Sequence, residues 1–320
     1  MTSSTATEAS PTPLPGSTRS PRSTASLRHR LAERGVDSSL LMLAPALIFA
    51  LTLFIYPFSY GIGLTFQPSA ATQQAWGGGV FANYVAFFKD SFIFDSVWLT
   101  MRLALPVAIF NVLASIPVAF KLRQRFRGKK LLTTLVVLPI TLGTVLTAQG
   151  LLIFAGRQGW LNRFLIQIGL IDQPIAFVNN YWGVVFSLVI SGFPFAFLLI
   201  SSYLSGIDPS IEAAAKVMGA NWHQRFRRVI LPLLAPGLAT TSILTFVLAF
   251  SVFPSARLVG DAMGSTRVMS LMAFRAFGEQ NDYSMASTIA IMMGLIELVV
   301  IALVLLWRSS MYKGSTGGKG

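Results

Sequence analysis

Six long runs of apolar residues, separated by polar stretches, dominate the hydropathy pattern of this chain. Each run is long enough to cross the hydrocarbon core of a bilayer, which takes about 20 helical residues. None shows the period-two alternation of a membrane β-strand, and a backbone in lipid must satisfy its own hydrogen bonds. The pattern therefore predicts an all-α integral membrane protein. The expected helices cover about residues 40–66, 97–120, 131–154, 182–204, 230–253 and 284–307.

Composition agrees with a membrane protein and narrows the chemistry. Hydrophobic residues make up 53% of the 320 residues and charged residues 12%, about half the globular norm. The chain has no cysteine, so disulfides, thiolate metal sites and a cysteine nucleophile are excluded. His29 and His223 lack any metal-ligand spacing. We expect no catalytic residue, no metal site and no cofactor.

The distribution of charge gives a topology. Eighteen of the 25 Lys and Arg residues lie in the N-terminal tail, the second and fourth connections and the C-terminal tail. Six others lie in the three remaining connections. The positive-inside rule then predicts a multi-pass membrane protein with both termini in the cytoplasm. The net charge of +13 follows this loop pattern and the membrane lipid it contacts, with no basic stripe that would suit nucleic acid.

Two tails flank the helical region. Residues 1–39 are rich in Ser, Thr, Pro, Ala and Arg, a composition that cannot bury enough apolar surface to fold. We expect a disordered cytoplasmic tail, with an organelle transit peptide as the alternative. Residues 40–307 form the expected six-helix domain, and residues 308–320 form a C-terminal cytoplasmic tail.

A polar island at residues 205–229 separates the fourth and fifth apolar runs. Asp208 or Ser210 is suited to cap a short helix that begins with Pro209. Gly219 stands where that helix should stop and can adopt a left-handed conformation. Asn221 can then cap a second helix. The island predicts a rigid helical hairpin at the basic face of the membrane.

The island resembles the EAA loop of permease subunits of binding-protein-dependent ABC importers. That family's pattern is Glu-Ala-Ala, three residues, Gly, nine residues and Ile-x-Leu-Pro. Counting from Gly219 places the triplet on residues 213–215, with Ala213 at the glutamate position and Glu212 one residue early. The closing segment falls on residues 229–232, with Val229 in place of isoleucine. The resemblance covers roughly residues 40–313, and segments 253–260 and 282–287 look most like the spermidine/putrescine branch.

The resemblance implies a type I importer permease bundle in the bacterial inner membrane that hydrolyses nothing itself. Its partners would be a cytoplasmic ATPase dimer, a second permease subunit and an extracytoplasmic solute-binding protein. Solutes carried in related systems include polyamines, opines, phosphonates and ferric iron. The residues expected to couple to the ATPase are Glu212, Ala213, Ala214, Ala215, Gly219, Ala220, Leu231 and Pro232.

Three polar residues inside the apolar runs are candidates for the translocation path. Glu297 lies midway along the sixth run, and a carboxylate in lipid is costly enough to suggest a function. Asn111 and Gln149 are the other two candidates. The alternative for all three is hydrogen bonding that joins helices, with Asn111, Gln149 or a Ser or Thr as the partner of Glu297.

Two other function classes remain open from the residues. A stand-alone secondary transporter or channel would need inverted repeats and broken helices, and we find no convincing internal repeat. A structural anchor for a cytoplasmic enzyme would need no polar group in the bundle, which Glu297 opposes.

Overall fold

The computed structural model describes residues 38–124 and 126–311, and the chain divides into two units, Met1–Phe58 and Ser59–Gly320. Helix α2 (Ser38–Thr65) begins in the first unit and contains Pro45 and Pro57. The expected tail at residues 1–39 lies almost wholly outside the described residues. Of the expected tail at residues 308–320, residues 312–320 also lie outside the described residues.

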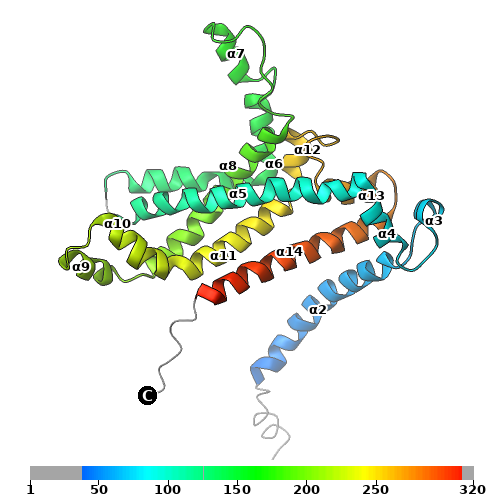
Figure 1. Cartoon of the computed structure of the whole chain (residues 1–320), viewed down its shortest axis with the longest axis horizontal. Helices are drawn as coiled ribbons and strands as arrows, with labels where there is room; N and C mark the ends of the chain where they lie inside the picture. The colour runs from blue at the N-terminus through cyan, green and yellow to red at the C-terminus, as the bar shows by residue number, and fades with distance from the viewer. Residues whose placement is uncertain (1–37, 125, 312–320) are drawn as a thin grey trace, which may run out of the picture. The chain divides into compact units, whose positions relative to one another are not determined.

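The second unit is built from helices throughout its described part (Figure 1). Six helices among the described residues are long and apolar enough to cross a membrane, which confirms the predicted all-α fold. The long helices of this unit are α5 (Ser91–Arg123), α6 (Lys129–Ala155), α8 (Tyr181–Ser205), α11 (Leu231–Phe250) and α14 (Tyr283–Met311). The short helices are α3 (Ala70–Trp76), α4 (Ala82–Lys89), α7 (Trp160–Gln167), α9 (Pro209–Val217), α10 (Trp222–Arg225), α12 (Pro254–Val259) and α13 (Met269–Gly278).

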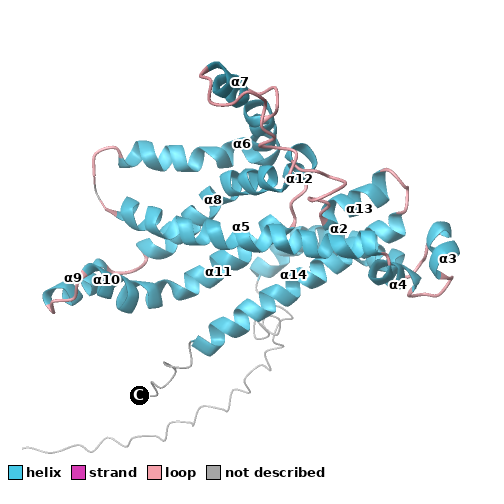
Figure 2. Ribbon diagram, turned by 45° about the horizontal axis from the view of Figure 1, so that its top comes forward, coloured by secondary structure: helices cyan, strands magenta, loops and turns pink. Residues whose placement is uncertain are grey.

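Helices α5, α8 and α11 pack together and form the centre of the second unit (Figure 2). Two buried clusters fill it. One surrounds Phe87, Phe250 and Met269, and the other surrounds Ile200, Ile230 and Leu234. Outward-facing side chains of the same helices are large and apolar, as lipid or a partner helix requires. These clusters fix the positions of the loops at both ends of α8 and α11.

Local sequence accounts for most helix boundaries. Asp90 caps α5 by accepting a hydrogen bond from the Phe92 amide at 2.8 Å, and Asn180 caps α8 through the Gly183 amide at 2.9 Å. Helix α6 is broken inside at Gly143, where φ is +68°, a conformation that suits glycine. The hydropathy pattern gave no indication of this break.

The fifth predicted helix differs from expectation. A π-helix, η1 (Phe226–Ile230), joins α10 directly to α11, so the helical path starts before residue 230. Helix α11 then ends at Phe250 rather than at 253. Helix α12 begins at Pro254, in the connection that follows α11.

Candidate functional site

The polar island folds as the expected helical hairpin. Asp208 caps α9 and accepts a hydrogen bond from the Ser210 amide at 2.8 Å, and Pro209 occupies the first turn. The backbone and side-chain hydrogen bonds of Ser210 lower the pKa of the exposed Asp208 carboxyl below its ordinary value. The cap is therefore ionised throughout the physiological pH range, which favours its place at the helix N-terminus.

Gly219 ends the first helix in the predicted left-handed conformation, with φ at +83°. The Ala220 amide donates to the Ala215 carbonyl at 3.1 Å, which closes the helix end across the turn. A Cβ atom at Gly219 would meet nothing within 4 Å. The requirement for glycine here is therefore conformational and not steric.

The second arm begins with a reciprocal cap. The Asn221 side chain accepts from the Gln224 amide at 2.8 Å, and the Gln224 side chain accepts from the Asn221 amide at 3.0 Å. Trp222 then stacks on Phe226 with 5.7 Å between ring centroids, and both rings contact Phe120 of α5. This aromatic contact attaches the hairpin to the membrane helices.

Glu212 is bound by two arginines of its own chain. Its carboxylate lies 3.3 Å from Nη1 of Arg225 on α10 and 3.8 Å from Nη1 of Arg123 at the end of α5. Arg123 also donates from Nη2 to the Ile207 carbonyl at 2.5 Å. Glu212 thus braces α9 against α10 and α5. A single sequence could not reveal this, because Arg123 lies far earlier in the chain.

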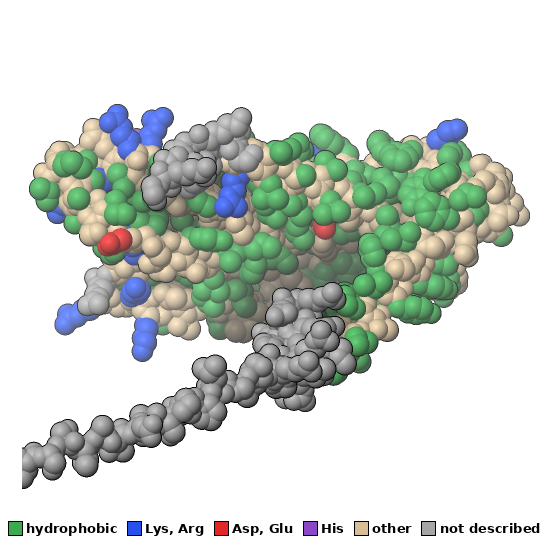
Figure 3. Space-filling view, turned by 90° about the horizontal axis from the view of Figure 1, so that it is seen from below, with side chains coloured by type: hydrophobic (Ala, Val, Ile, Leu, Met, Phe, Trp, Pro, Cys, Tyr) green, Lys and Arg blue, Asp and Glu red, His purple; other side chains and the backbone are tan. Residues whose placement is uncertain are grey.

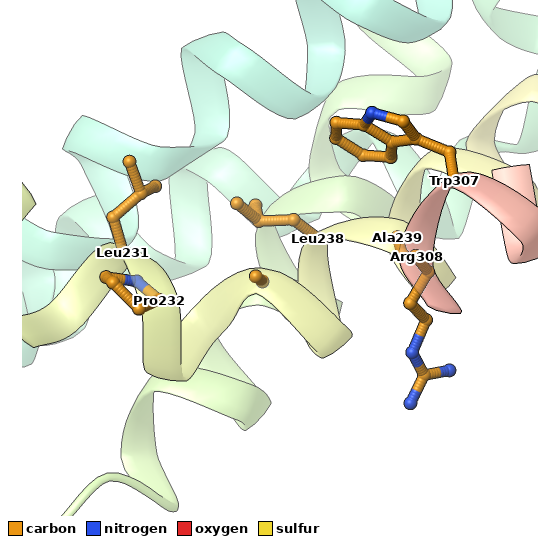
Figure 4. A pocket seen from close by; sticks show the side chains of 7 residues that line it. Leu231, Pro232, Leu238, Ala239, Trp307 and Arg308 are labelled. Carbon is orange, nitrogen blue, oxygen red and sulfur yellow. The ribbon is translucent and has the colours of Figure 1, made fainter. Parts of the chain in front are cut away.

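The remaining coupling candidates lie in three places: on α9, at the turn and at the start of α11. Ala213 and Ala214 are exposed on α9, Ala215 is buried, and Ala220 is half-buried at the turn. Leu231 and Pro232 lie apart from α9, in the first turn of α11. There they line a groove of about 280 Å³ with Leu238 and Trp307, while the Arg308 guanidinium points away from those leucines (Figure 4).

Two exposed residues of the hairpin were not among the residues predicted from the sequence. Val217 and Met218, just before the glycine turn, expose 88% and 81% of their surface. Apolar side chains so bare at the tip of a polar hairpin suit contact with another protein. The signal was available as two apolar residues directly before the turn. We call the exposed surface of Ala213, Ala214, Val217 and Met218 the hairpin tip.

Basic side chains surround the hairpin. Lys121, Arg127, Lys130, Lys216 and Arg227 are all exposed at the connections of α5 to α6 and of α8 to α11. Figure 3 shows Lys and Arg side chains gathered towards the end of the second unit that carries α9 and α10, with hydrophobic side chains covering the surface beyond. This segregation is the one that a membrane boundary produces.

The structure does not bring the three path candidates together. Asn111 is buried between α5 and α8, where its amide donates to the Leu188 carbonyl at 3.4 Å. Gln149 is exposed on α6. Glu297 lies half-buried on α14 and accepts a hydrogen bond of 2.9 Å from the Ser251 hydroxyl. Asn111 therefore serves the helix–helix contact, and Glu297 has a serine partner, one of the classes expected.

Metal chemistry finds no support in the described ranges. They contain no group of three or more His, Cys, Asp or Glu side chains placed to hold a metal ion. What the hairpin offers is an exposed apolar tip beside Lys216 and a base held by ion pairs, which suit contact with another protein.

Comparison with known proteins adds to this geometry. Residues 111–311 match the model of the family described as "binding-protein-dependent transport system inner membrane component". The chain is 32% identical over 207 residues to a probable sulfate transport system permease protein of Prototheca wickerhamii, which covers 64% of this chain and 79% of that protein.

A second relative and a solved structure are also similar to this chain. The chain is 34% identical over 183 residues to the spermidine/putrescine transport system permease protein PotB of Haemophilus influenzae, covering 56% of this chain and 63% of PotB. The fold resembles a chain of a bacterial ABC transporter that imports alginate, with a TM-score of 0.72 and 20% identity over 89% of this chain and 98% of that chain.

Proposed function

Because the chain belongs to the family of binding-protein-dependent transport system inner membrane components, we propose that its hairpin tip couples a cytoplasmic ATPase to the solute path. The chain is a non-catalytic, multi-pass membrane permease component of an ABC importer. ATP hydrolysis would then come from a separate dimeric ATPase. A second permease subunit and an extracytoplasmic solute-binding protein would complete the importer.

The observation that carries the proposal is the set of contacts that holds the hairpin beneath its exposed tip. Two capped helices, the Gly219 turn and the Glu212 brace hold the tip in one orientation. The aromatic contact to Phe120 and the direct continuation through η1 link it to α5 and α11. A push on the tip is therefore transmitted to the membrane helices as a rigid-body movement.

Topology and solute form the remaining parts of the proposal. The hairpin, both termini and the basic loops face the cytoplasm of a bacterial cell. The solute is small and polar, and polyamine, sulfate and ferric iron systems all have relatives of this chain. Glu297 lines the path, whereas Asn111 serves the contact of α5 with α8.

Substitution at Gly219 tests the coupling. Gly219→Val places a β-branched residue at φ +83°, which costs about 1–3 kcal/mol of backbone strain and displaces the tip. Gly219→Asn keeps a residue that tolerates this conformation. We expect uptake by the reconstituted importer to fall about tenfold or more in the valine variant and to stay near wild type in the asparagine variant.

A neighbouring glycine supplies the control. Gly206 has φ of −75°, and a Cβ there would make only an ordinary 3.5 Å contact, so Gly206→Ala should transport normally. Membrane insertion is followed by the amount of chain in washed membranes. Full uptake and full ATPase stimulation in an inserted Gly219→Val variant would refute the coupling role.

A further inference from the structure

Helix α11 ends opposite the middle of α14. Ser251, the residue that follows α11, donates its hydroxyl hydrogen bond to Oε1 of Glu297. Glu297 is the midpoint of α14 (Tyr283–Met311), so it lies about 21 Å from either end of that helix at 1.5 Å per residue. The fifth membrane span therefore stops being helical at a point opposite the middle of the sixth span.

Two contacts within the chain fix the turn that follows α11. The Ser270 hydroxyl donates to the Val252 carbonyl, and Phe253 packs on Phe274 of α13 with 5.0 Å between ring centroids. Helices α12 and α13 then carry the chain to the start of α14. The interruption is therefore a built feature of the fold, at the depth where many transporters place a broken helix.

The Glu297 carboxylate, the Ser251 hydroxyl and the last carbonyls of α11 can all accept hydrogen bonds at this turn. The last carbonyls of a helix lack intrahelical donors and carry the negative end of its dipole. Glu297 adds a carboxylate, and it is the only Asp or Glu deep within the membrane spans of the described chain. The Ser251 side chain is exposed beside it. Within the described residues Glu297 has no basic partner within 4.0 Å.

Arg257 on α12 is the basic residue of the segment that follows the turn. Its guanidinium lies over the Phe274 ring, 5.0 Å from the centroid, so it is engaged there. A carboxylate without a basic partner and a free helix end cannot face lipid at this depth without a large penalty. The face that carries them therefore suits water or solute in the path rather than lipid.

We propose that Glu297, Ser251 and the C-terminal end of α11 form a site for the ammonium group of a cationic solute. An ammonium has three donors and no acceptor, which matches a site composed of acceptors. The negative potential would repel an anion such as sulfate. The inference rests on the proposed permease function and narrows its solute to organic amines.

Uptake by the complete importer in proteoliposomes tests the site, with radiolabelled spermidine and sulfate as probes. We expect the wild type to accumulate spermidine and not sulfate. Glu297→Gln removes a charge-assisted contact and should raise the KM for spermidine about ten- to a hundredfold. Glu297→Asp keeps the charge and should restore much of the affinity.

Glu279→Gln is the matched control. It removes a carboxylate that directly follows α13 and pairs with Arg275 of that helix, outside the spans, and should leave the KM unchanged. ATP hydrolysis and yield of the complex show whether Glu297→Gln assembles. Should that variant fail to assemble, spermidine must protect the wild-type Glu297 from labelling by a hydrophobic carbodiimide, and unprotected labelling overturns the site.

Three results would contradict the ammonium site. Accumulation of sulfate, accumulation of neither probe, or a wild-type KM in Glu297→Gln would overturn the ammonium site. The coupling proposal is judged separately in the same preparation, by the response of ATP hydrolysis to Gly219→Val. A coupled importer that ignores spermidine would therefore defeat only the assignment of the solute.

Discussion

Glu212 shows how a displaced residue can acquire a different role. The EAA-loop pattern that this segment resembles places glutamate at the position held here by Ala213, and Glu212 precedes it by one residue. The shift turns the carboxylate from the tip towards Arg225 and Arg123, which bind it inside the chain. The tip itself is left apolar. In this protein the carboxylate stiffens the hairpin, and the ATPase would meet alanine, valine and methionine.

The brace predicts a graded effect of Glu212→Gln. The side chains of Glu212, Arg123 and Arg225 keep 17–25% of their surface exposed. Water therefore still screens the two ion pairs, and each is worth about 0.5–1 kcal/mol. We expect solute uptake per ATP hydrolysed to fall about two- to fivefold, with normal membrane insertion. Reconstituted uptake and ATPase assays on the same preparation measure this ratio.

A double-mutant cycle separates the brace from direct contact with the ATPase. If Glu212 acts through Arg225, the pair Glu212→Gln and Arg225→Gln should lose no more coupling than either change alone. Additive losses would instead place Glu212 in contact with a partner. Protection of residues 209–217 from hydrogen exchange should fall in both single variants.

At the scale of elements, η1 places a wider turn between the hairpin and α11. The Leu231 amide donates to the Phe226 carbonyl five residues earlier, which marks one residue more than an α-helix would need. Such a bulge absorbs an extra residue without rotating the helices on either side. Its place between the hairpin and the membrane sets the angle at which the tip is presented.

Single-residue deletions test this account. Deleting the exposed Arg227 should convert η1 to α-helix and keep both flanks in register, so the thermal unfolding temperature in detergent should change little. Deleting Leu244, exposed in the middle of α11, rotates its flanks by about 100° and should lower that temperature markedly. Equal losses in both variants would show that η1 stores no extra residue.

The elements differ in how far the sequence predicts them, for physical reasons. The six spans were predictable because hydropathy accumulates over about 20 residues and one substitution does not change the sum. Caps at Asp208 and Asn221 and the turn at Gly219 were predictable because each depends on its own neighbours. The bulge at η1 and the exact end of α11 were not, because Val252 and Phe253 continue an apolar run up to Pro254, and the contact of Ser270 with the Val252 carbonyl helps to place the turn before that proline.

Across the whole molecule, the basic connections predict which side each loop faces. The chain has no cysteine, so single cysteines introduced at Lys216 and Asp172 report accessibility without background. We expect a membrane-impermeant maleimide to label Asp172→Cys in intact spheroplasts. Lys216→Cys should react only after the membrane is opened. The reverse pattern would place the hairpin outside the cell and end the coupling account.

The bare hairpin tip also bears on how much of this protein a cell keeps. If the hairpin faces the cytosol as proposed, a copy without its ATPase would display Val217 and Met218 to the chaperones and proteases that survey unassembled subunits. Assembly would then cover these side chains and protect the chain from degradation. The abundance of the permease would follow the supply of its ATPase, and surplus copies would be short-lived.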